Sequence, residues 1–586
     1  MATAVAPPGD PAPVAPSPPV GTAATGAAQA WRTRVVLAVV SALLVGFALR
    51  VAIGLTDDAP ATDETAYLRS GTSLVEGDGY GREGQPELHF PPFVPVLLGL
   101  GSRVTSDPHA GTVALTCLAS TALILPLALL GRRIAGPVAG IGTAWVAALA
   151  PGLSTTIVNR GAGSEAEYTL LIVGAVWLVV SAADQQARGR LVRVFGAGVL
   201  VGLAYLTRPE GLFMVVPLGA AVLVLAGRRP GQPARLRRPD VRRVRVGAPL
   251  LAVFLVPVVV CVVPYAMYLH DNTGKWQLSA KTHDASIEAW HAVARGDRET
   301  RDSVLYALDE TGLHFAAGRS SLATLAREDP GGYLGIVRTN IGTLTTSVVN
   351  PVSDQRLSWL LLPLPLWGLA VFGAWRHRRS GVVRLLLAVG ALPVATALAF
   401  FVQPRYLIVA VALATPLIGA AIAALSAAWR RPVMLVVVAL LALSSVQAFH
   451  GEAAGWWHPA DRSDQRVAGE WIAANTGRSD RIMTRSMVVE HYAERPTMVM
   501  PYAGINEILR YARHYGARYL VVDWYTAVRL RPQLEPLRTT DRIPGLRLAH
   551  EVRVEGHTTR IFALDPPPAS VGPIGSSLGF VGDGQS

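Results

Sequence analysis

The sequence predicts a polytopic α-helical membrane protein with about eleven transmembrane helices and a small extracytoplasmic α/β domain near its C-terminal end. Three observations predict this class: long apolar runs, few charges, and arginine clusters between the runs. The chain has 586 residues, of which 51% are hydrophobic and 16% charged, and its mean hydropathy is +0.36. Soluble globular chains carry roughly 25% charged residues, so the composition argues against a soluble enzyme of several domains.

The first 30 residues are rich in alanine, proline, glycine and threonine and carry a single charge, Asp10. Such a segment cannot bury a core, and we expect a disordered cytoplasmic tail. It lacks the basic start and early apolar run of a cleavable signal peptide. The first span, near 34–55, therefore remains as an anchor, with the N-terminus inside.

Apolar runs of about 20 residues are long enough to cross the roughly 30 Å core of a bilayer. We expect eleven such spans, near 34–55, 109–130, 137–158, 165–183, 193–208, 210–227, 246–268, 357–374, 382–402, 405–426 and 432–450. Together they form a transmembrane domain at 31–450.

The charges between the runs orient these spans. The net charge is +12, nearly all from arginine, and it gathers in short clusters rather than on one globular face, which argues against a nucleic-acid partner. The clusters are Arg132–Arg133, Arg188–Arg193, Arg228–Arg245, Arg376–Arg379 and Arg430–Arg431. With eleven spans they all fall on one side, which the positive-inside rule makes the cytoplasmic side.

Three longer segments then lie on the outer side: about 56–108, about 269–356, and everything after 450. Within the first, residues 91–105 are apolar but short for a span, so we expect an interfacial or re-entrant helix. The region 451–565 alternates predicted helices and strands: helices at 464–475 and 504–515, and strands at 481–485, 497–500, 517–523, 546–554 and 558–564. We expect an extracytoplasmic α/β domain there, and a disordered tail at 566–586.

Acidic residues open the first outer loop. A helix is predicted to begin at Asp63, with Thr62 as its cap. Asp63 and Tyr67 then share one helix face, four residues apart. An acidic pair at this place also simply favours the positive end of a helix, and that alternative stays open.

Five segments carry motifs in order, all at predicted outer ends of spans. They are the Asp63-Glu64 loop with His89-Phe90-Pro91-Pro92, SEAEYTLL at 164–171, GLAYLTRPEGL at 202–212, PYAMYLHDNTGKWQLSAKT at 264–282 and QPRYLIVAVALATPLIG at 403–419. Together they resemble the glycosyltransferase-C superfamily, closest to family 39, which includes protein O-mannosyltransferases and the aminoarabinose transferases of lipid A. The resemblance covers roughly residues 34–450.

The resemblance implies a glycosyltransferase that moves a sugar from a polyprenyl phosphate to a hydroxyl acceptor, with the first-loop aspartate as general base. The chemistry agrees, because glycosyl transfer needs a base for the acceptor proton. A lipid phosphate leaves without a strong acid but needs fixed positive charge, unlike the paired carboxylates of glycoside hydrolases. We assign Asp63 as the base, with Glu64 and Asp58 as reserves, and expect inversion from direct displacement.

Candidate cations for the donor phosphate are Arg208 and Arg405, each at an outer span end, against the inside bias of the other arginines. Arginines there also snorkel to the interface, which is the alternative. Tyr406 is a candidate phosphate hydrogen-bond donor or an interfacial aromatic. The only two lysines, Lys275 and Lys281, share one outer loop and are further candidates.

Tyr67, His89 and Glu165 are candidates for positioning the acceptor or the loop. Glu165 orients the acceptor or caps a helix, and we favour capping. His89 stands where aminoarabinose-transferase relatives have an acidic residue near the donor phosphate, and this departure argues against carrying over a metal site. The two cysteines, Cys117 and Cys261, lie in apolar spans, so no disulfide framework is expected. We assign no metal, and no cofactor beyond the lipid-linked sugar donor.

The sequence thus predicts a multi-pass plasma-membrane enzyme acting at the outer face. Its partners would be a membrane lipid carrier and an envelope glycan, lipid or exported protein as acceptor. A transporter or lipid-glycan flippase is the alternative. Transporters more often place charges in span centres or break helices in matched halves, whereas here the polar residues gather in the outer loops.

Overall fold

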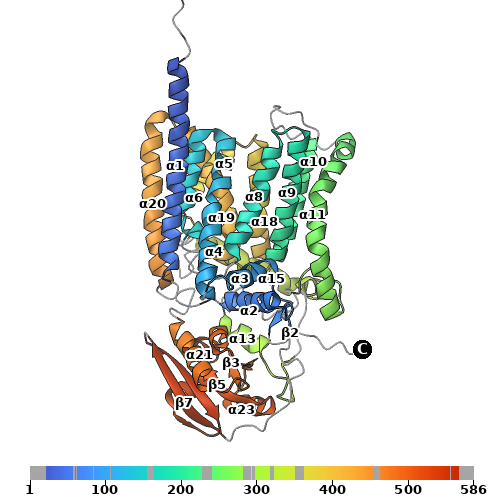
Figure 1. Cartoon of the computed structure of the whole chain (residues 1–586), viewed down its shortest axis with the longest axis vertical. Coiled ribbons are helices and arrows are strands. Elements are labelled where there is room, and N and C mark those ends of the chain that lie inside the picture. The colour runs from blue at the N-terminus through green and yellow to red at the C-terminus, as the bar shows by residue number, and fades with distance from the viewer. Residues whose placement is uncertain are drawn as a thin grey trace, which may run out of the picture.

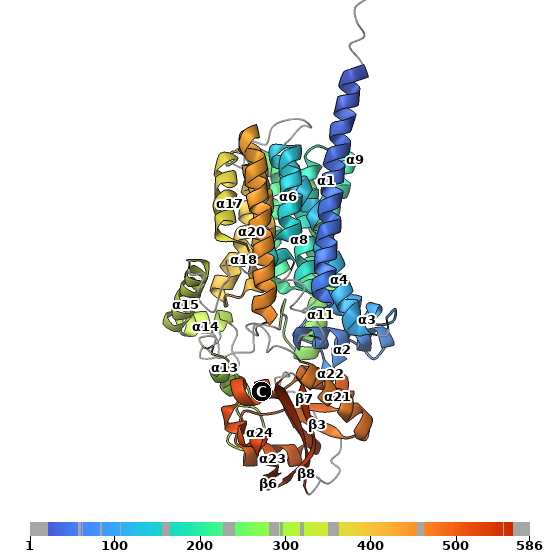
Figure 2. The same cartoon turned by 90° about the vertical axis from the view of Figure 1, so that its left-hand side faces the viewer.

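The computed structural model consists of a bundle of long helices and a smaller α/β unit at one end of it (Figure 1). It describes residues 22–56, 60, 62–82, 85–105, 107–154, 164–226, 241–280, 292, 297–316, 322–349, 362–453, 462–554 and 556–565. The first helix, α1 (Thr22–Gly54), extends past the other helices at the end remote from the α/β unit (Figures 1 and 2).

The bundle is built from apolar helices. They are α4 (Pro108–Ala122), α5 (Ile124–Ala135), α6 (Pro137–Leu149), η1 (Pro151–Leu153), α8 (Glu165–Ala182), α9 (Ala187–Thr207), η2 (Pro209–Met214), α10 (Val215–Ala226), α11 (Val241–Thr273), α17 (Leu364–Arg376), α18 (Gly381–Ala399), η3 (Pro404–Leu407), α19 (Ile408–Ala424) and α20 (Ala427–Ala453), together with α1. Among the described residues, eight segments are long and apolar enough to cross a membrane, and two shorter apolar helices lie at Pro137–Leu149 and Pro209–Leu225.

Every expected span has a helical counterpart in the described residues. Three of these counterparts are short: α6 and α17 have 13 residues each, and the segment after α9 is divided into η2 and α10. The polytopic helical class with a C-terminal α/β unit is confirmed, and the count of eleven spans stays a prediction.

Helix α19 lies at the centre of the bundle, and 83% of the most apolar 18-residue stretch within Arg405–Ala424 is buried. Its Gly419 lies directly against α6: a Cβ atom there would be 2.3 Å from Thr143 Oγ1 and 2.4 Å from the Ala139 carbonyl oxygen. Only glycine permits this approach. Helix α19 is therefore closely packed against α6, and the short helix η3 is joined directly to its first residue.

A buried arginine ties α1 to the end of α6. Arg50 is fully buried, and its guanidinium donates to the carbonyl oxygens of Ala147, Ala148 and Leu153 at 3.2, 3.0 and 2.5 Å. It also donates to Ser120 Oγ of α4 at 3.1 Å. The last carbonyls of a helix have no partner within it, so Arg50 caps α6 from a neighbouring helix.

The predicted first outer segment folds over the end of the bundle that faces the α/β unit (Figure 2). It contains α2 (Thr62–Glu76), β1 (Gly81–Arg82), β2 (Gln85–Pro86) and α3 (Phe93–Gly101). Helix α2 begins one residue before the expected start, and α3 is the short helix expected within 91–105. The two helices cross in close contact, since a Cβ on Gly71 would lie 1.9 Å from the Pro95 carbonyl oxygen.

The predicted second outer segment contains α13 (Arg298–Leu305), α14 (Leu322–Glu328) and α15 (Pro330–Val349). The α13 segment joins the α/β unit: Asp302 accepts from Arg485 at 2.9 Å and from Arg531 at 2.8 Å. Helix α15 instead lies beside the lower end of α18, outside the spans (Figure 2).

The α/β unit contains a six-stranded sheet in the order β4-β3-β5-β8-β7-β6. Strand β3 pairs parallel with β4 and β5, whereas β7 and β8 are antiparallel. Its elements are α21 (Ser463–Asn475), β3 (Arg481–Thr484), α22 (Met487–Ala493), β4 (Thr497–Val499), α23 (Ile505–His514), β5 (Ala517–Val522), η4 (Thr526–Leu530), η5 (Pro532–Leu534), α24 (Pro536–Thr539), β6 (Arg542–Ile543), β7 (Leu546–Val554) and β8 (His557–Leu564).

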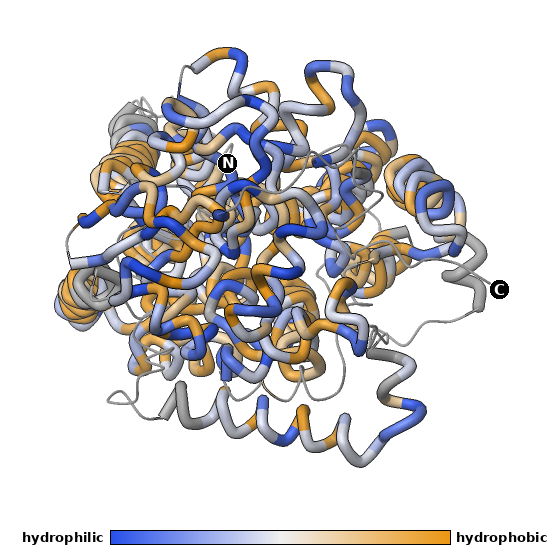
Figure 3. Tube along the Cα trace, turned by 90° about the horizontal axis from the view of Figure 1, so that it is seen from below, coloured by the Kyte–Doolittle hydropathy of each residue, from blue (hydrophilic) through white to orange (hydrophobic). Residues whose placement is uncertain are grey.

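Hydrophobic side chains are buried on both faces of this sheet, and successive strand residues point to opposite faces. Ile482 and Ile561 belong to one buried cluster, whereas their neighbours Met483 and Phe562 belong to another, as expected for side chains that point to opposite faces. All the helices and strands expected at 464–564 are present. Viewed from this side, hydrophilic segments are frequent in the unit, and the spans behind it are mainly hydrophobic (Figure 3).

Candidate functional site

Asp63 lies in the first turn of α2, at the end of the bundle that faces the α/β unit. Its Oδ2 accepts a hydrogen bond from Arg405 Nη1 at 2.8 Å, although 342 residues separate the two in sequence. The side chains are 29% and 22% exposed. The predicted base and one of the predicted cations are therefore in direct contact, and both side chains are partly exposed to solvent.

Arg405 is held from several sides in the turn between α18 and α19. Its Nε donates to Gln403 Oε1 at 2.9 Å, and its Nη2 donates to the Tyr406 hydroxyl at 3.2 Å. Its Nη1 also lies 4.0 Å from a carboxylate oxygen of Glu165. These contacts fix the direction of the guanidinium before any substrate arrives.

Arg208 lies behind this pair, at the C-cap of α9. Its Nη1 donates to Glu165 Oε1 at 2.7 Å and to Ser164 Oγ at 3.2 Å. Both charged side chains are largely buried, with 8% and 7% exposed. Glu165, which we expected to cap α8, lies in its first turn but directs its carboxylate to Arg208.

Together these side chains form a chain of alternating charge, Asp63–Arg405–Glu165–Arg208. The first pair is accessible and the second is buried, so the buried carboxylate keeps two like charges close together. The guanidinium carbons of Arg405 and Arg208 each lie 5.1 Å from the centre of the Tyr406 ring. Two pre-oriented guanidinium groups around one tyrosine are suited to bind an oxyanion.

Tyr67 of α2 packs beside the cluster, next to Ser164. Its hydroxyl lies 3.5 Å from Ser164 Oγ, and its ring contacts Phe90 edge-on at 4.7 Å. Burial raises the pKa of Tyr67 well above its usual value, and the Asp63 carboxylate raises it further. The phenol therefore stays protonated at neutral pH and can donate a hydrogen bond.

The other predicted residues lie elsewhere. Glu64 Oε1 meets His109 Nδ1 of α4 at 2.7 Å, so its carboxylate faces α4. The ring of His89 packs edge-on against Phe90, with centroids 4.6 Å apart, and its backbone N–H donates to Glu87. Lys275 is exposed in the turn after α11. Asp58 and Lys281 lie outside the described residues.

Sequence reasoning missed the groups that orient the two arginines. Ser164, Gln403 and the Tyr168 ring, 6.0 Å from Arg208, were not among the candidates. Glu210 adds a further negative charge near Arg208. The only available signal was that Ser164 and Gln403 each stand beside a predicted residue in the resembling segments SEAE and QPRY.

The cluster contains two carboxylates that could in principle contact a cation, Asp63 and Glu165. Among the described residues, no group of three or more His, Cys, Asp or Glu side chains is arranged to hold a metal ion. The two nearest carboxylates of the cluster, Asp63 and Glu165, both lie beside Arg405. A guanidinium therefore already occupies the place between them.

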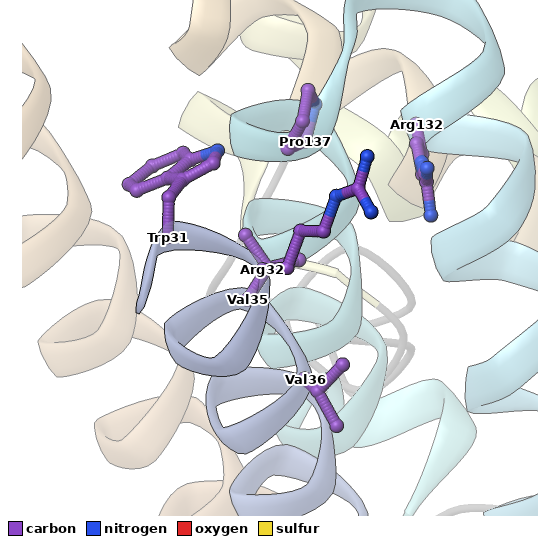
Figure 4. A pocket seen from close by; sticks show the side chains of 6 residues that line it. All are labelled: Trp31, Arg32, Val35, Val36, Arg132 and Pro137. Carbon is purple, nitrogen blue, oxygen red and sulfur yellow. The ribbon is translucent and has the colours of Figure 1, made fainter. Parts of the chain in front are cut away.

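A shallow groove opens at the other end of the bundle (Figure 4). Its lining residues are Trp31, Arg32, Val35, Val36, Arg132 and Pro137. They belong to α1 and to the region where α5 passes into α6. This groove is separate from the charged cluster, because α1 and α6 reach the cluster side at their opposite ends.

One family model matches the chain, that of dolichyl-phosphate-mannose-protein mannosyltransferase, over residues 89–264. The match includes Glu165 and Arg208 and ends before Arg405. No curated protein matches the chain by sequence.

Solved structures share the fold. The oligosaccharyltransferase of Archaeoglobus fulgidus, in complex with zinc and sulfate, aligns with a TM-score of 0.56 and 14% identity over 85% of this chain and 70% of that one. The same enzyme with an inhibitory peptide and a dolichol-phosphate gives 0.50 and 14%, over 85% and 70%.

ArnT from Cupriavidus metallidurans bound to undecaprenyl phosphate gives a TM-score of 0.51 and 13% identity, over 90% of this chain and 98% of that one. At these identities the likeness shows a common fold, and the family match adds a sequence signature over residues 89–264. Of the five motif segments, 164–171 and 202–212 lie wholly within the matched residues. The chain therefore shares the fold of these glycosyltransferase structures and, over residues 89–264, matches the model of the mannosyltransferase family.

Proposed function

We propose that the chain is a membrane glycosyltransferase that moves a sugar from a polyprenyl-phosphate donor to a hydroxyl of a cell-envelope glycan, lipid or exported protein at the outer face of the plasma membrane. The observation that carries this proposal is the contact of Asp63 with Arg405 beside the buried Arg208–Glu165 pair. A base and two phosphate-binding cations then lie in one connected cluster.

The accessible Arg405 is the first contact for the donor phosphate. A phosphate oxygen can replace Asp63 at Nη1, because Gln403 and Tyr406 still hold the rest of the guanidinium. Charge-assisted hydrogen bonds from guanidinium to phosphate are short and strong. Arg208 adds positive charge from behind, where its burial makes each electrostatic interaction stronger than in water.

Donor binding also prepares the base. While Asp63 is paired with Arg405, the nearby positive charge favours its ionised form and lowers its basicity. Once the phosphate takes over Arg405, the Asp63 carboxylate becomes a stronger proton acceptor. Base strength is thus linked to the presence of the donor.

The reaction is a single displacement. The acceptor oxygen forms a bond to the anomeric carbon while the bond from that carbon to the phosphate oxygen breaks, and its electrons remain on the departing polyprenyl phosphate. The acceptor proton moves to Asp63. Arg405 and Arg208 stabilise the negative charge that develops on the phosphate, and attack opposite the leaving group inverts the anomeric centre.

The arrangement of helices supports an outer location of the cluster. Helices α8 and α19 begin at the cluster and α9 ends there, so the arginines at the start of α9 and of α20 lie at the opposite end. The positive-inside rule makes that end cytoplasmic. The α/β unit lies on the same side as the cluster, since Arg69 of α2 pairs with Glu490 of α22 at 2.6 Å.

In this proposal residues 31–450 form the transferase domain, with a cytoplasmic tail at 1–30. Residues 451–565 form an extracytoplasmic domain, followed by a tail at 566–586. The structures that share the fold support a lipid-linked donor: one was solved with undecaprenyl phosphate and another with a dolichol-phosphate and a peptide.

The test is to delete the gene and analyse envelope glycans, lipids and exported proteins by mass spectrometry. We expect a sugar to be missing and to return with the wild-type gene and with Arg378→Ala, which alters an exposed arginine at the cytoplasmic end. Arg405→Ala, made at the same level, should not restore it. Full restoration by Arg405→Ala would contradict the proposal.

A second measurement separates an enzyme from a flippase. Detergent-solubilised membranes contain no sealed compartments, so a flippase is not needed there. Transfer in such extracts should still depend on this chain if it is the transferase. Transfer that proceeds equally well without it would favour the flippase.

A further inference from the structure

Helix α15 (Pro330–Val349) has 20 residues, yet it is not among the eight candidate spans found in the described residues. It lies within the second outer segment, against the lower end of α18 (Figure 2). Its place in the fold is fixed by hydrogen bonds to the last turn of α18. That turn ends the candidate span Gly381–Ala399.

The contact face of α15 is well defined. Tyr333 Oη donates to the Ala399 carbonyl at 3.4 Å, and Asn340 Nδ2 donates to the carbonyls of Leu398 and Phe400, each at 3.0 Å. Ile336 and Asn340 are fully buried. These contacts place α15 at the depth where α18 leaves the apolar layer.

The opposite face of α15 combines apolar side chains with a cation. Leu334 is 65% exposed and Ile341 47% exposed, and the exposed Arg338 lies between them. With a spacing of four and then three residues, these three share one helix face. An arginine between two exposed apolar side chains can place its guanidinium at a headgroup phosphate while its apolar neighbours contact the acyl chains.

We infer that α15 lies in the interface of the outer leaflet, with Leu334 and Ile341 among the acyl chains and Arg338 at a headgroup phosphate. We further infer that Asn340 is a positioning residue that holds the turn leading to Arg405. This second part rests on the proposed function, because it assigns Arg405 to the donor phosphate.

The link through Asn340 is short. The carbonyls it binds are at the C-terminal end of α18, where they lack helical partners, and Arg405 follows only five residues after Phe400. The turn also contains Gln403, which accepts from Arg405 Nε at 2.9 Å. A shift of α15 relative to α18 would therefore move the guanidinium that meets Asp63.

The first experiment measures depth in the bilayer. Leu334 and Ile341 are changed one at a time to cysteine in a Cys117→Ala Cys261→Ala background, labelled with a fluorophore, and placed in nanodiscs with spin-labelled phospholipid. We expect about the same loss of fluorescence as for Met267→Cys, because Met267 is 49% exposed and lies near the end of α11 that contacts the Tyr80 loop. Val467→Cys, 39% exposed on the α/β unit, is the unquenched control.

Quenching at Leu334 and Ile341 no greater than at Val467 would overturn the interfacial placement. Adding Arg338→Glu should reduce quenching at Leu334, because a carboxylate repels the headgroup phosphate. Unchanged quenching would refute the phosphate contact. Neither measurement needs enzymatic activity, so both decide the placement whether or not the proposed function holds.

The second experiment tests Asn340 by kinetics. Asn340→Ala should raise the KM for the polyprenyl-phosphate donor about tenfold, the effect of one lost buried contact, while kcat at saturating donor stays close to wild type. Thr339→Ala is the matched control, because the Thr339 hydroxyl donates within α15 to the Gly335 carbonyl. Asn340→Gln, which keeps both amide donors, should restore part of the loss. An unchanged donor KM in Asn340→Ala would refute the positioning role.

Discussion

Replacement of Asp63 by asparagine tests the central assignment with a change of one atom. The side chain keeps its shape, and its amide oxygen can still accept from Arg405 Nη1. Because both partners are partly exposed, the lost charge pair should lower stability by only about 0–1 kcal/mol. Loss of a positioned general base typically costs about 100- to 10,000-fold in rate, which corresponds to about 3–5 kcal/mol of barrier.

Donor affinity should change in the opposite direction. Arg405 keeps its contacts with Gln403 and Tyr406 and no longer has to leave a carboxylate when the phosphate binds. We therefore expect Asp63→Asn to bind undecaprenyl phosphate as well as wild type, or up to about fivefold more tightly, since the competing pair is worth up to about 1 kcal/mol.

The assay combines transfer of an isotope-labelled sugar with titration of undecaprenyl phosphate into protein in nanodiscs. Glu64→Gln is the comparison, because this neighbour is buried against His109, and its loss of kcat should be much the smaller. Asp63→Asn with wild-type kcat would refute the assignment of the base. Weaker lipid binding in the same variant would refute the exchange of Asp63 for phosphate at Arg405.

Three further changes probe the site and its support. The Arg208→Met Glu165→Gln double variant removes both members of the buried pair, so neither partner remains as an uncompensated charge. Titration should then show undecaprenyl phosphate binding at least about tenfold weaker, and unaltered binding would exclude Arg208 from the donor site. Gly71→Ala places a Cβ 1.9 Å from the Pro95 carbonyl oxygen and should displace α2, and a shift of about 1 Å can lower kcat about 100-fold. The kinetic control is Gly101→Ala, which meets nothing within 4 Å, and equal rates would show that α2 tolerates the shift. Burial lowers the pKa of His491 to about 4, and the nearby Arg69 and His109 lower it further, against the effect of Asp107. Below about pH 6.5 the imidazole of His491 is protonated in the unfolded chain but stays neutral in the folded chain until about pH 4. The free energy of unfolding should therefore fall between pH 6.5 and pH 4, by at most about 3 kcal/mol. Melting curves of wild type and His491→Gln over this range should diverge on acidification, and parallel curves would contradict the reasoning.

Much of the fold could be predicted because its signals are local. Apolar length located the spans, and alternation located the strands of the α/β unit, including the pair β7 and β8. The division into η2 and α10 was not predicted, because hydropathy treats residues 210–227 as one span. The short helix α22 was also missed, because seven residues hold too few turns for periodicity to be recognised.

The site could be predicted only as a set of separate residues. Position at outer span ends selected Asp63, Arg208 and Arg405 individually, but no spacing rule pairs Asp63 with Arg405 across 342 residues. Glu165 was assigned to helix capping because local sequence shows the helix start and not the arginine that packs against it. Long-range pairing depends on how the helices pack, which a single sequence does not display.

The buried Arg50 has a consequence for how the protein is made. A guanidinium costs about 2.5–3.5 kcal/mol at the centre of an inserted helix and less near the end, where Arg50 lies. The carbonyls that satisfy it are synthesised about a hundred residues later. Until α6 is made, the guanidinium of Arg50 therefore lacks the carbonyls that it binds in the folded protein. Slower synthesis of the residues between α1 and α6 should thus lower the yield of the folded protein, because α1 stays unpaired for longer.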